Sequence, residues 1–256
     1  MNRLVTIPVS HFCEKARWAL DRAQVSYLEE GHAPILHWRA TMVHHTRTVP
    51  LLVTSGAVLR SSSDIVRWAD TRCLAGQHLF PDDPSDRREV EELEAHFDSK
   101  LGPATRRWAY FHLLQDRTRT LDVLGAPIPE GERRVLVKTF GVLTGLMKRG
   151  MGIDAAGAAR SLERIKAIFA EVSGRLSDGR RYLVGDRFSA ADLAFVALAI
   201  PALAPPQYPW MPPWETLFPA MRAEMQGFRQ TPAGRFALRV YEVERPRATR
   251  VMMASA

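Results

Sequence analysis

The stretch VSHFCEKARWAL, residues 9–20, places Ser10 and Cys13 three positions apart at the start of a run with helical periodicity. This is the spacing of a thiol redox site in which an oxygen replaces the first sulfur. A helix N-terminus offers free backbone N–H groups and the positive end of the helix dipole, which favour an anion such as a thiolate. Ser10 therefore has two interpretations. It is the N-cap of this helix, or its hydroxyl donates a hydrogen bond to a thiolate that a ligand brings and lowers the pKa of that thiol.

The sequence around this stretch alternates short strand patterns with helical ones. Residues 4–7 and 25–30 predict strands on either side of a helix at residues 11–23. Residues 50–60, PLLVTSGAVLR, predict a hairpin, and residues 62–74 return to the helical pattern. The order β-α-β followed by β-β-α predicts a small sheet with parallel and antiparallel pairs and with helices packed against it.

The remainder of the chain has a helical pattern. Asp83 followed by Pro84 suits an N-cap with proline at the first helical position, so we place a domain boundary at residues 80–85. In the segment YLVGDRFSAADLAF, Ser189 is an expected N-cap and Asp192 is its capping-box partner. The second domain is therefore expected to be all helical.

The composition is that of a soluble globular protein, because 46% of the 256 residues are hydrophobic and 25% are charged. No apolar run is long enough to span a membrane and the N-terminal sequence has no signal-peptide pattern, so we expect a cytoplasmic protein. Two cysteines are too few for a disulfide framework. The net charge of +7 is spread along the chain, and acidic residues interrupt the Arg-rich tail at residues 229–250, so we expect no nucleic-acid partner.

Two further motifs offer polar groups at the ends of predicted elements. In TVPLLV, residues 48–53, a proline opens a strand and leaves the preceding backbone free to bind another molecule. In RSSSDIVRWAD, residues 60–70, three serines precede a helical run and bring hydroxyl and helix N–H groups to a carboxylate. The second motif is equally compatible with a plain helix cap.

In this order, four motifs resemble those of the cytosolic glutathione transferase family. SHFCEKARWAL resembles its active-site loop and first helix, TVPLLV its segment with a cis-proline, SSSDI its γ-glutamyl-binding turn, and YLVGDRFSAADLAF its capping-box motif. The resemblance covers nearly the whole chain. It implies an α/β thioredoxin-like domain at residues 1–80 that holds glutathione, and an all-α domain at residues 85–256 that supplies the wall of a site for an apolar second substrate.

The resemblance also implies roles for individual residues. Ser10 matches the activating residue of serine-type transferases, and Ser62 matches the serine that takes the γ-glutamyl carboxylate. Val49 with Pro50 matches the pair whose backbone binds the tripeptide. Ser61 stands where the family often has an acidic residue, which would contact the ammonium group of the ligand.

Further residues follow from the same resemblance. The complete set that we expect at the glutathione site, besides the catalytic Ser10, is Phe12, Cys13, His45, Val49, Pro50, Ser61 and Ser62. Trp108 and Phe111 lie where the family places its apolar substrate wall, although an aromatic cluster is more often part of a core. The four histidines between residues 32 and 45 lack cysteine or carboxylate partners at ligand spacing, so we expect no metal site.

The function implied by the resemblance is a detoxifying conjugation. Glutathione, as co-substrate, is held as a thiolate by Ser10, and its sulfur attacks an apolar electrophile at carbon or sulfur. A homodimer is the habit of the family. Two alternatives remain open: a binding protein that kept the fold without the chemistry, and a thiol transferase that uses Cys13.

Residues 115–153 are longer than a simple connection between two helices, and residues 130–150 within them predict an inserted amphipathic helix with basic residues near both ends. One interpretation is a helix that lies on an anionic membrane surface. The other, which we favour at this stage, is a helix packed on the helical domain over the mouth of the substrate site. Gly141 and Gly145 support it, because glycines weaken an isolated helix and allow close packing against a neighbour.

Overall fold

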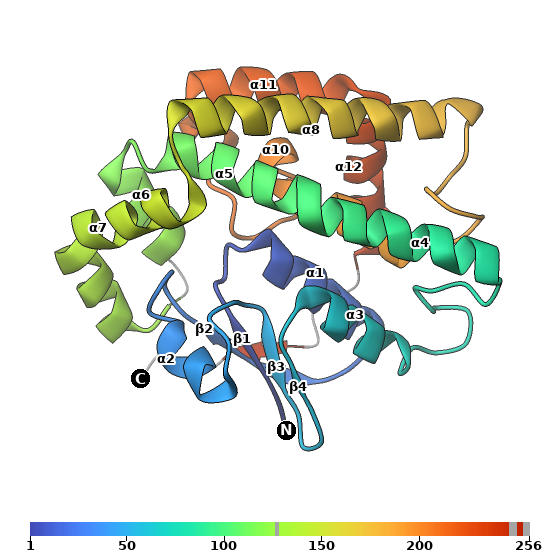
Figure 1. The fold of residues 1–256 in the computed structure, drawn as a ribbon, viewed down its shortest axis with the longest axis horizontal. Coiled ribbons are helices and arrows are strands. Elements are labelled where there is room, and N and C mark those ends of the chain that lie inside the picture. The colour runs from blue at the N-terminus through green and yellow to red at the C-terminus, as the bar shows by residue number, and fades with distance from the viewer. Residues whose placement is uncertain (126–127, 246–249, 253–256) are drawn as a thin grey trace. The chain divides into compact units, whose positions relative to one another are not determined.

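The computed structural model of the chain describes residues 1–125, 128–245 and 250–252 (Figure 1). The described chain forms two compact units. The first contains residues 1–77 and 116–147 together with a C-terminal strand, and the second contains residues 78–115 and 148–245. The first boundary lies close to the expected one at residues 80–85. Residues 116–147, which we expected in the helical domain, are instead grouped with the first unit.

The first unit is built on a five-stranded sheet with the strand order β4-β3-β1-β2-β5. Its strands are β1 (Asn2–Thr6), β2 (Tyr27–Gly31), β3 (Leu51–Val53), β4 (Val58–Leu59) and β5 (Arg250–Met252). β2 runs parallel to β1 and to β5, whereas β3 runs antiparallel to β1 and to β4. The predicted mixed sheet is confirmed, and β5 is an additional strand that the sequence pattern did not predict.

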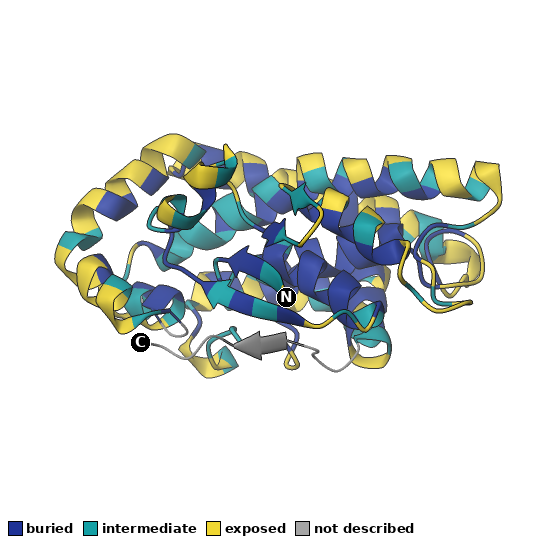
Figure 2. Cartoon of the chain, turned by 90° about the horizontal axis from the view of Figure 1, so that it is seen from below, coloured by how far each residue is buried: buried dark blue, intermediate teal, exposed yellow. Residues whose placement is uncertain are grey.

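In the first unit, a helix follows β1 and another follows β4, as the sequence predicted. The helices of this unit are α1 (His11–Arg22), α2 (Trp38–Thr41), the 3-10 turn η1 (Met42–His44), α3 (Ser62–Asp70), α6 (Arg117–Gly125) and most of α7 (Glu130–Met151). The helix predicted at residues 11–23 is confirmed, and its side chains Ala16, Ala19 and Leu20 have no exposed surface. α1 packs against α3. Buried residues concentrate in the sheet and in α1, whereas much of α7 is exposed (Figure 2).

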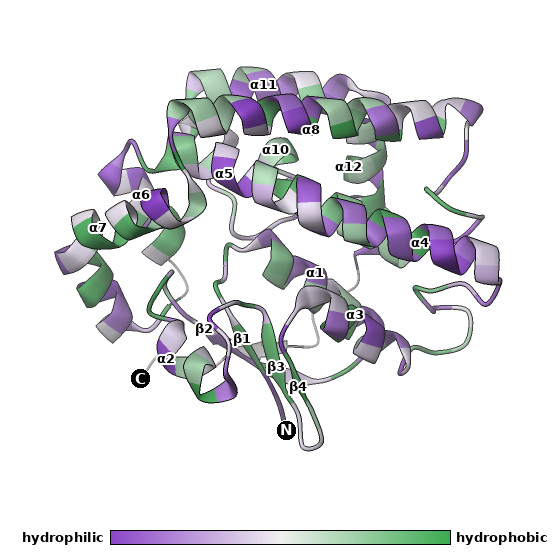
Figure 3. Cartoon of the chain, viewed as in Figure 1, coloured by the Kyte–Doolittle hydropathy of each residue, from purple (hydrophilic) through white to green (hydrophobic). Residues whose placement is uncertain are grey.

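Every described element of secondary structure in the second unit is helical, which confirms the all-α prediction. Its helices are α4 (Pro84–His96), a π-helical turn η2 (Phe97–Leu101), α5 (Gly102–Leu113), α8 (Ala155–Arg175), the 3-10 turn η3 (Leu176–Asp178), α9 (Ala190–Leu198), α10 (Ile200–Leu203), the 3-10 turn η4 (Trp214–Thr216), α11 (Pro219–Gln230) and α12 (Pro232–Glu244). α4 presents mainly hydrophilic residues in Figure 3, while Val90 and Leu93 on its other side are buried.

The N-terminus of α9 contains the predicted capping box. The N–H and the hydroxyl of Ser189 both donate to Asp192 Oδ2 at 2.8 Å, and the N–H of Leu183 donates to Asp192 Oδ1 at 2.8 Å. Burial raises the pKa of Asp192 to about 6, although these hydrogen bonds act in the opposite direction. The carboxyl therefore joins the start of α9 to the chain before it.

Among the helices that the structure describes, we find none with the length and apolar character needed to cross a membrane.

Candidate functional site

The antiparallel pairing of β1 with β3 brings two of the predicted motifs to one edge of the sheet. Val5, near the carboxyl end of β1, pairs with Leu51, the first residue of β3. The loop that follows β1 and leads to Ser10 therefore starts at the same edge as the segment that ends at Pro50. Motifs about 40 residues apart in the sequence are neighbours because of this register.

Ser10 is the N-cap of α1, with φ of −76° and ψ of 123°. Its hydroxyl accepts a long hydrogen bond of 3.5 Å from the N–H of Cys13, and its carbonyl accepts one of 3.0 Å from the N–H of Glu14. The residue is half-buried. Both interpretations of Ser10 fit this geometry, because a weakly engaged cap hydroxyl at a helix N-terminus also suits an anionic ligand.

Cys13 is completely buried in α1. Burial raises the pKa of its thiol to about 11, and the opposing effects of the Arg17 charge and of a hydrogen bond with Ser10 are smaller. A thiol with this pKa stays protonated at neutral pH, and the thiolate is the reactive form. Cys73 has a pKa of about 11 for the same main reason, its burial, with the Asp70 charge adding to it.

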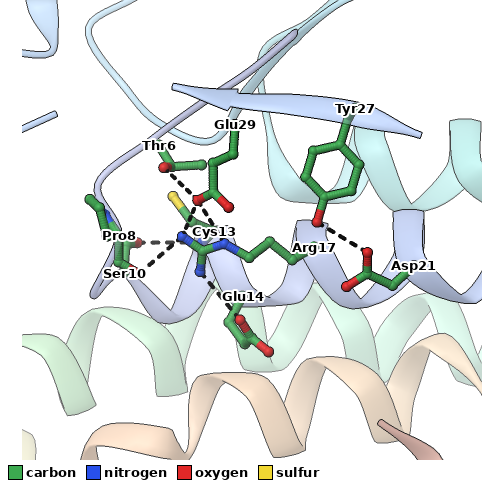
Figure 4. Close-up of polar contacts among 9 residues, drawn as sticks. All are labelled: Thr6, Pro8, Ser10, Cys13, Glu14, Arg17, Asp21, Tyr27 and Glu29. Atoms are coloured by element: carbon green, nitrogen blue, oxygen red, sulfur yellow. Dashed lines mark hydrogen bonds and ion pairs between the residues drawn. The ribbon is translucent and has the colours of Figure 1, made fainter. Parts of the chain in front are cut away.

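A buried ionic network lies directly behind the Ser10 loop (Figure 4). The Arg17 guanidinium donates to Glu29 Oε1 at 2.9 and 2.6 Å, to Glu14 at 3.2 Å and to the carbonyl of Pro8 at 3.0 Å. The hydroxyl of Thr6 also donates to Glu29 Oε1, at 2.8 Å. Because Pro8 precedes Ser10 by two residues, Arg17 ties the helix body, β2 and the loop together.

This network was not predicted from the sequence, although a signal for it exists there. Side chains in a strand alternate between faces, so Glu29 must point to the same side of β2 as the buried Tyr27. A carboxylate on that side needs a buried cation, since an unpaired buried charge is very unfavourable. The Tyr27 hydroxyl makes a second link to α1, to Asp21 Oδ1 at 3.1 Å.

The peptide bond between Val49 and Pro50 is cis, as the resemblance implied. Within the described residues, neither the N–H nor the carbonyl of Val49 has a hydrogen-bond partner. The sheet pairing begins only at Leu51, and proline has no N–H of its own. Val49 therefore offers one donor and one acceptor in the backbone segment beside the Ser10 loop.

The serine motif forms the N-terminus of α3. Ser61 is the N-cap, and its exposed hydroxyl accepts a hydrogen bond of 3.1 Å from the N–H of Asp64. Ser62 is 5% exposed, and neither its N–H nor its hydroxyl has a partner among the described residues. The buried Lys15 of α1 places Nζ 3.4 Å from the hydroxyl of Ser63. This cation was not predicted from the sequence, and it lies at a helix N-terminus that already favours an anion.

The remaining residues predicted for the glutathione site are Phe12 and His45. Phe12 is half-buried, and its ring lies 4.8 Å from that of His11. His45 is exposed, with a left-handed φ of 57°, and its N–H donates to the carbonyl of Met42 at 3.0 Å. The imidazole is thus exposed in the segment that leads to Val49.

The other histidines of this region are bound to different partners. His37 Nε2 lies 2.9 Å from the carbonyl of Arg47, and His32 contacts Glu30 at 3.0 Å and Glu132 at 2.6 Å. Across residues 1–125, 128–245 and 250–252, no three His, Cys, Asp or Glu side chains are grouped to hold a metal ion.

The predicted apolar-substrate residues lie on α5, in the second unit. Trp108 is 2% exposed, and its ring packs edge-on against His112 with centroids 5.4 Å apart. Phe111 is half-buried and contacts the same histidine ring at 5.4 Å. Trp108 is thus largely a core residue, and Phe111 is the more accessible of the two.

Comparisons with solved structures identify proteins of the same fold. A glutathione S-transferase from Xanthobacter autotrophicus is 16% identical, with a TM-score of 0.61 and 97% of each chain covered. The β-etherase LigF from Sphingobium sp. is 16% identical, with a TM-score of 0.58, covering 93% of this chain and 98% of that chain. A theta class glutathione S-transferase from Xanthomonas axonopodis pv. citri, with glutathione bound, is 19% identical, with a TM-score of 0.57 and coverage of 93% and 96%.

Comparisons of the sequence are more specific. No curated protein matches the chain. The family model described as the glutathione S-transferase N-terminal domain matches residues 4–73, and the model of the C-terminal domain matches residues 155–223. These two matches cover more than half of the 256 residues, and the chain belongs to the glutathione S-transferase family.

Proposed function

We propose that this protein binds glutathione in its first unit and transfers the glutathione sulfur to an apolar electrophile. The observation that supports this proposal is a set of weakly engaged polar groups on neighbouring elements of that unit. They are the hydroxyl of Ser10, the unpaired backbone of Val49, and the unpaired N–H and hydroxyl of Ser62. All three residues fall within the segment that the N-terminal family model matches.

Val49 is assigned to the peptide backbone of glutathione. An extended peptide pairs with free N–H and carbonyl groups in the way that an added strand does. Val49 offers one of each immediately before β3. His45, in the exposed segment just before it, is assigned to the glycyl carboxylate.

Ser62 is assigned to the γ-glutamyl carboxylate. The N–H groups and the dipole of α3 favour an anion there, and Lys15 adds a positive charge beside Ser63. The ammonium group of the same glutamyl moiety meets no carboxylate from position 61. The Ser61 hydroxyl is already bonded to the N–H of Asp64. We therefore expect weaker glutathione binding than an acidic residue at position 61 would give.

Ser10 is assigned to the glutathione sulfur. A hydrogen bond from its hydroxyl favours the thiolate, so the bound thiol releases its proton to solvent at a lower pH. The thiolate then attacks the electrophilic atom of the second substrate, a bond to sulfur forms, and the leaving group departs with its electron pair. The protein contributes proximity and stabilisation of the sulfur charge. Phe111 of α5 is assigned to the apolar second substrate.

The alternative in which Cys13 is the reactive thiol has less support. Its sulfur is completely buried and its pKa is raised to about 11, so at neutral pH the thiolate fraction is very small. We assign Cys13 a packing role behind the loop. A Cys13→Ser variant should therefore keep its conjugation rate.

Calorimetric titration with glutathione tests the binding part of the proposal. Wild-type protein should release or take up heat on binding, and Ser62→Ala should weaken the affinity roughly tenfold by removing one hydrogen bond to a charged group. Ser99→Ala, an exposed serine of the second unit, is the matched control and should bind as wild type. Absence of heat with wild type would favour a protein that kept the fold for a different ligand.

Ultraviolet titration of the bound thiolate tests the chemical part. Wild-type protein should lower the pKa of the glutathione thiol. In Ser10→Ala that pKa should return toward its solution value, and conjugation of an aryl halide probe should slow roughly tenfold to a hundredfold. Affinity for glutathione should change little. An unshifted thiol pKa in wild type, or an unchanged rate in Ser10→Ala, contradicts the role given to Ser10.

A further inference from the structure

Helix α7 has two different sides. The buried side chains Leu136, Leu143, Thr144 and Met147 make up one side. On another side, Val135, Val142 and Leu146 are 42%, 67% and 53% exposed. Val142 and Leu146 are four positions apart and lie about one turn apart on the same side of the helix, whereas Val135 precedes a kink at Thr139, where φ is −106° and ψ is 15°. We call Val135, Val142 and Leu146, with the exposed residues beside them, the outer face of α7.

Two glycines belong to this outer face. A Cβ atom built at Gly141 or at Gly145 meets no atom within 4 Å in the described chain. Within the described part of the first unit, neither glycine therefore serves close packing against a neighbouring element. They leave the backbone and the adjacent Val142 and Leu146 accessible from outside. The mixture of hydrophobic and hydrophilic residues along α7 is visible in Figure 3.

The charges on the exposed part of α7 are nearly all positive. Its exposed cations are Arg133, Arg134, Lys138, Lys148 and Arg149. The carboxylates of the helix are both in its first turn, at Glu130 and Glu132. Glu130 lies 4.0 and 3.9 Å from the first two arginines, and Glu132 is bound to His32 and to the N–H of Ala33.

From the middle of α7 onward, no described carboxylate offsets the cations. Lys138, Lys148 and Arg149 form no ion pair within the residues that the structure describes. Lys138 lies between Val135 and Val142 in sequence, and Arg149 continues the line of Val142 and Leu146 one turn further. Val142, Leu146 and Arg149 therefore lie on one side of the helix after the kink at Thr139, and the exposed Lys138 directly precedes that kink.

We propose that the outer face of α7 docks on an anionic lipid surface. Exposed aliphatic side chains enter the boundary between headgroups and acyl chains, and lysine and arginine side chains bind the lipid phosphates and carboxylates. A second copy of this chain fits the same face less well, because pairing two outer faces would bring five cations against five cations. The helix lies on the surface in this arrangement and does not cross the bilayer.

Vesicle co-sedimentation of the full chain tests the proposal. The probes are vesicles of phosphatidylcholine alone and of phosphatidylcholine mixed with phosphatidylserine, each at low and at high salt. Wild-type protein should pellet with the mixed vesicles at low salt. It should bind weakly to phosphatidylcholine alone, and high salt should reduce its binding to the mixed vesicles because salt screens the charges.

Two multiple variants separate the charge from the aliphatic contribution. Lys138→Gln with Lys148→Gln and Arg149→Gln should weaken binding to the mixed vesicles roughly a hundredfold, at about fivefold for each cation. Val142→Ser with Leu146→Ser should weaken it roughly tenfold. The matched controls are Arg160→Gln with Arg164→Gln and Lys166→Gln on α8, and Val243→Ser on α12. The controls should bind vesicles as wild type does.

Three outcomes would overturn the proposal. They are absence of wild-type binding to phosphatidylserine vesicles, binding that both α7 variants retain, and a dimer, seen by light scattering, that Val142→Ser with Leu146→Ser abolishes. All of the substituted side chains are exposed, so circular dichroism and glutathione conjugation should match wild type. A failure of the vesicle test is thereby distinct from a failure of the glutathione site.

Discussion

Helices α1 and α9 both begin with a serine N-cap, yet the two serines are held in opposite ways. Ser189 of α9 is 2% exposed, and its N–H and hydroxyl both donate to Asp192 at 2.8 Å. Ser10 of α1 is half-buried, and its hydroxyl accepts a hydrogen bond of 3.5 Å from the N–H of Cys13. The same residue at the same helical position is fixed in one case and accessible to a ligand in the other.

The bodies of the two helices explain this difference. α9 is apolar apart from Asp192 and completely buried, so its polar anchoring is confined to its N-terminus. α1 buries Glu14, Arg17 and Asp21 along its length, and their partners on β2 and in the preceding loop hold the helix in place. α1 therefore depends little on its cap, which leaves the Ser10 hydroxyl available to a ligand.

The largest expected loss of stability follows from replacing Arg17, which anchors α1 to β2 and to the preceding loop. Arg17→Leu should lower the free energy of unfolding by about 4 kcal/mol, because it leaves two buried carboxylates without their cation. Denaturant unfolding measures this value. Arg88→Leu is the control, since its ion pair with Glu92 is exposed, and should cost less than about 0.5 kcal/mol. A loss of unfolding free energy below about 1 kcal/mol for Arg17→Leu would mean that the buried ionic network does not hold α1 in place.

The second largest loss of stability should follow from replacing Asp192, which anchors α9. Asp192→Ala should cost about 3 kcal/mol of unfolding free energy, since the N–H groups of Leu183 and Ser189 lose their acceptor while buried. The conjugation rate of the remaining folded protein should equal that of wild type. Asp186→Ala, whose side chain is 97% exposed, should leave stability unchanged. Equal stability of the two variants would mean that the capping box does not anchor α9.

Replacing either serine should cost less stability than replacing an anchor. Only one of the two replacements should change the pKa of bound glutathione. Ser189→Ala should cost about 1.5 kcal/mol of stability and leave the pKa of bound glutathione as in wild type. Ser10→Ala should cost about 0.5 kcal/mol, the low end for a cap, while it raises that pKa. Thermal unfolding and thiolate titration of both variants measure the contrast. If Ser10→Ala is the less stable of the two, Ser10 is chiefly a structural cap.

The anchor of α7 also uses a side chain near a helix N-terminus, and its expected effect on stability lies between those of Ser189→Ala and Ser10→Ala. Burial alone would lower the pKa of His32, but the hydrogen bonds to Glu132 and Glu30 outweigh it and raise the pKa to about 9. Since the folded pKa lies above the unfolded one of about 6.5, the stabilisation is complete below pH 6.5 and is lost as the pH rises through 9.

The experiment for this anchor compares wild type with His32→Gln across pH. Wild type should be more stable by about 1 kcal/mol at pH 6, and the difference should shrink to near zero above pH 10. His45→Gln, which replaces an exposed histidine, should show no such trend. A difference between wild type and His32→Gln that stays constant with pH would show that the charge of His32 is not part of the anchor.

Several features could be predicted from the sequence because they depend on residues close together in the chain. The order of strands and helices along the N-terminal half follows from periodicity and turn residues. Ser189 and Asp192 are three positions apart, and Ser10 directly precedes a helical run, so these two caps could be identified, whereas the sequence left open which of three serines caps α3. The resemblance added the cis bond at Pro50, which the structure contains.

Features that join distant residues could not be predicted in the same way. The link between Arg17 and Glu29 spans 12 positions, that between Lys15 and Ser63 spans 48, and that between His32 and Glu132 spans 100. Composition and periodicity indicate that such residues exist and are polar, and they do not indicate which of them meet. The assignment of residues 116–147 to the first unit depends on contacts of this kind.

The sequence by itself determined the fold class, the family resemblance and the positions of the serine caps of α1 and α9, because backbone propensity, capping and turn chemistry act over a few residues. Only the tertiary structure decided which cap is engaged, that Cys13 is too deeply buried to ionise at neutral pH, and that the outer face of α7 remains accessible. The physical reason is that burial and the pairing of buried charges are properties of a three-dimensional neighbourhood, which residues far apart in the chain create together.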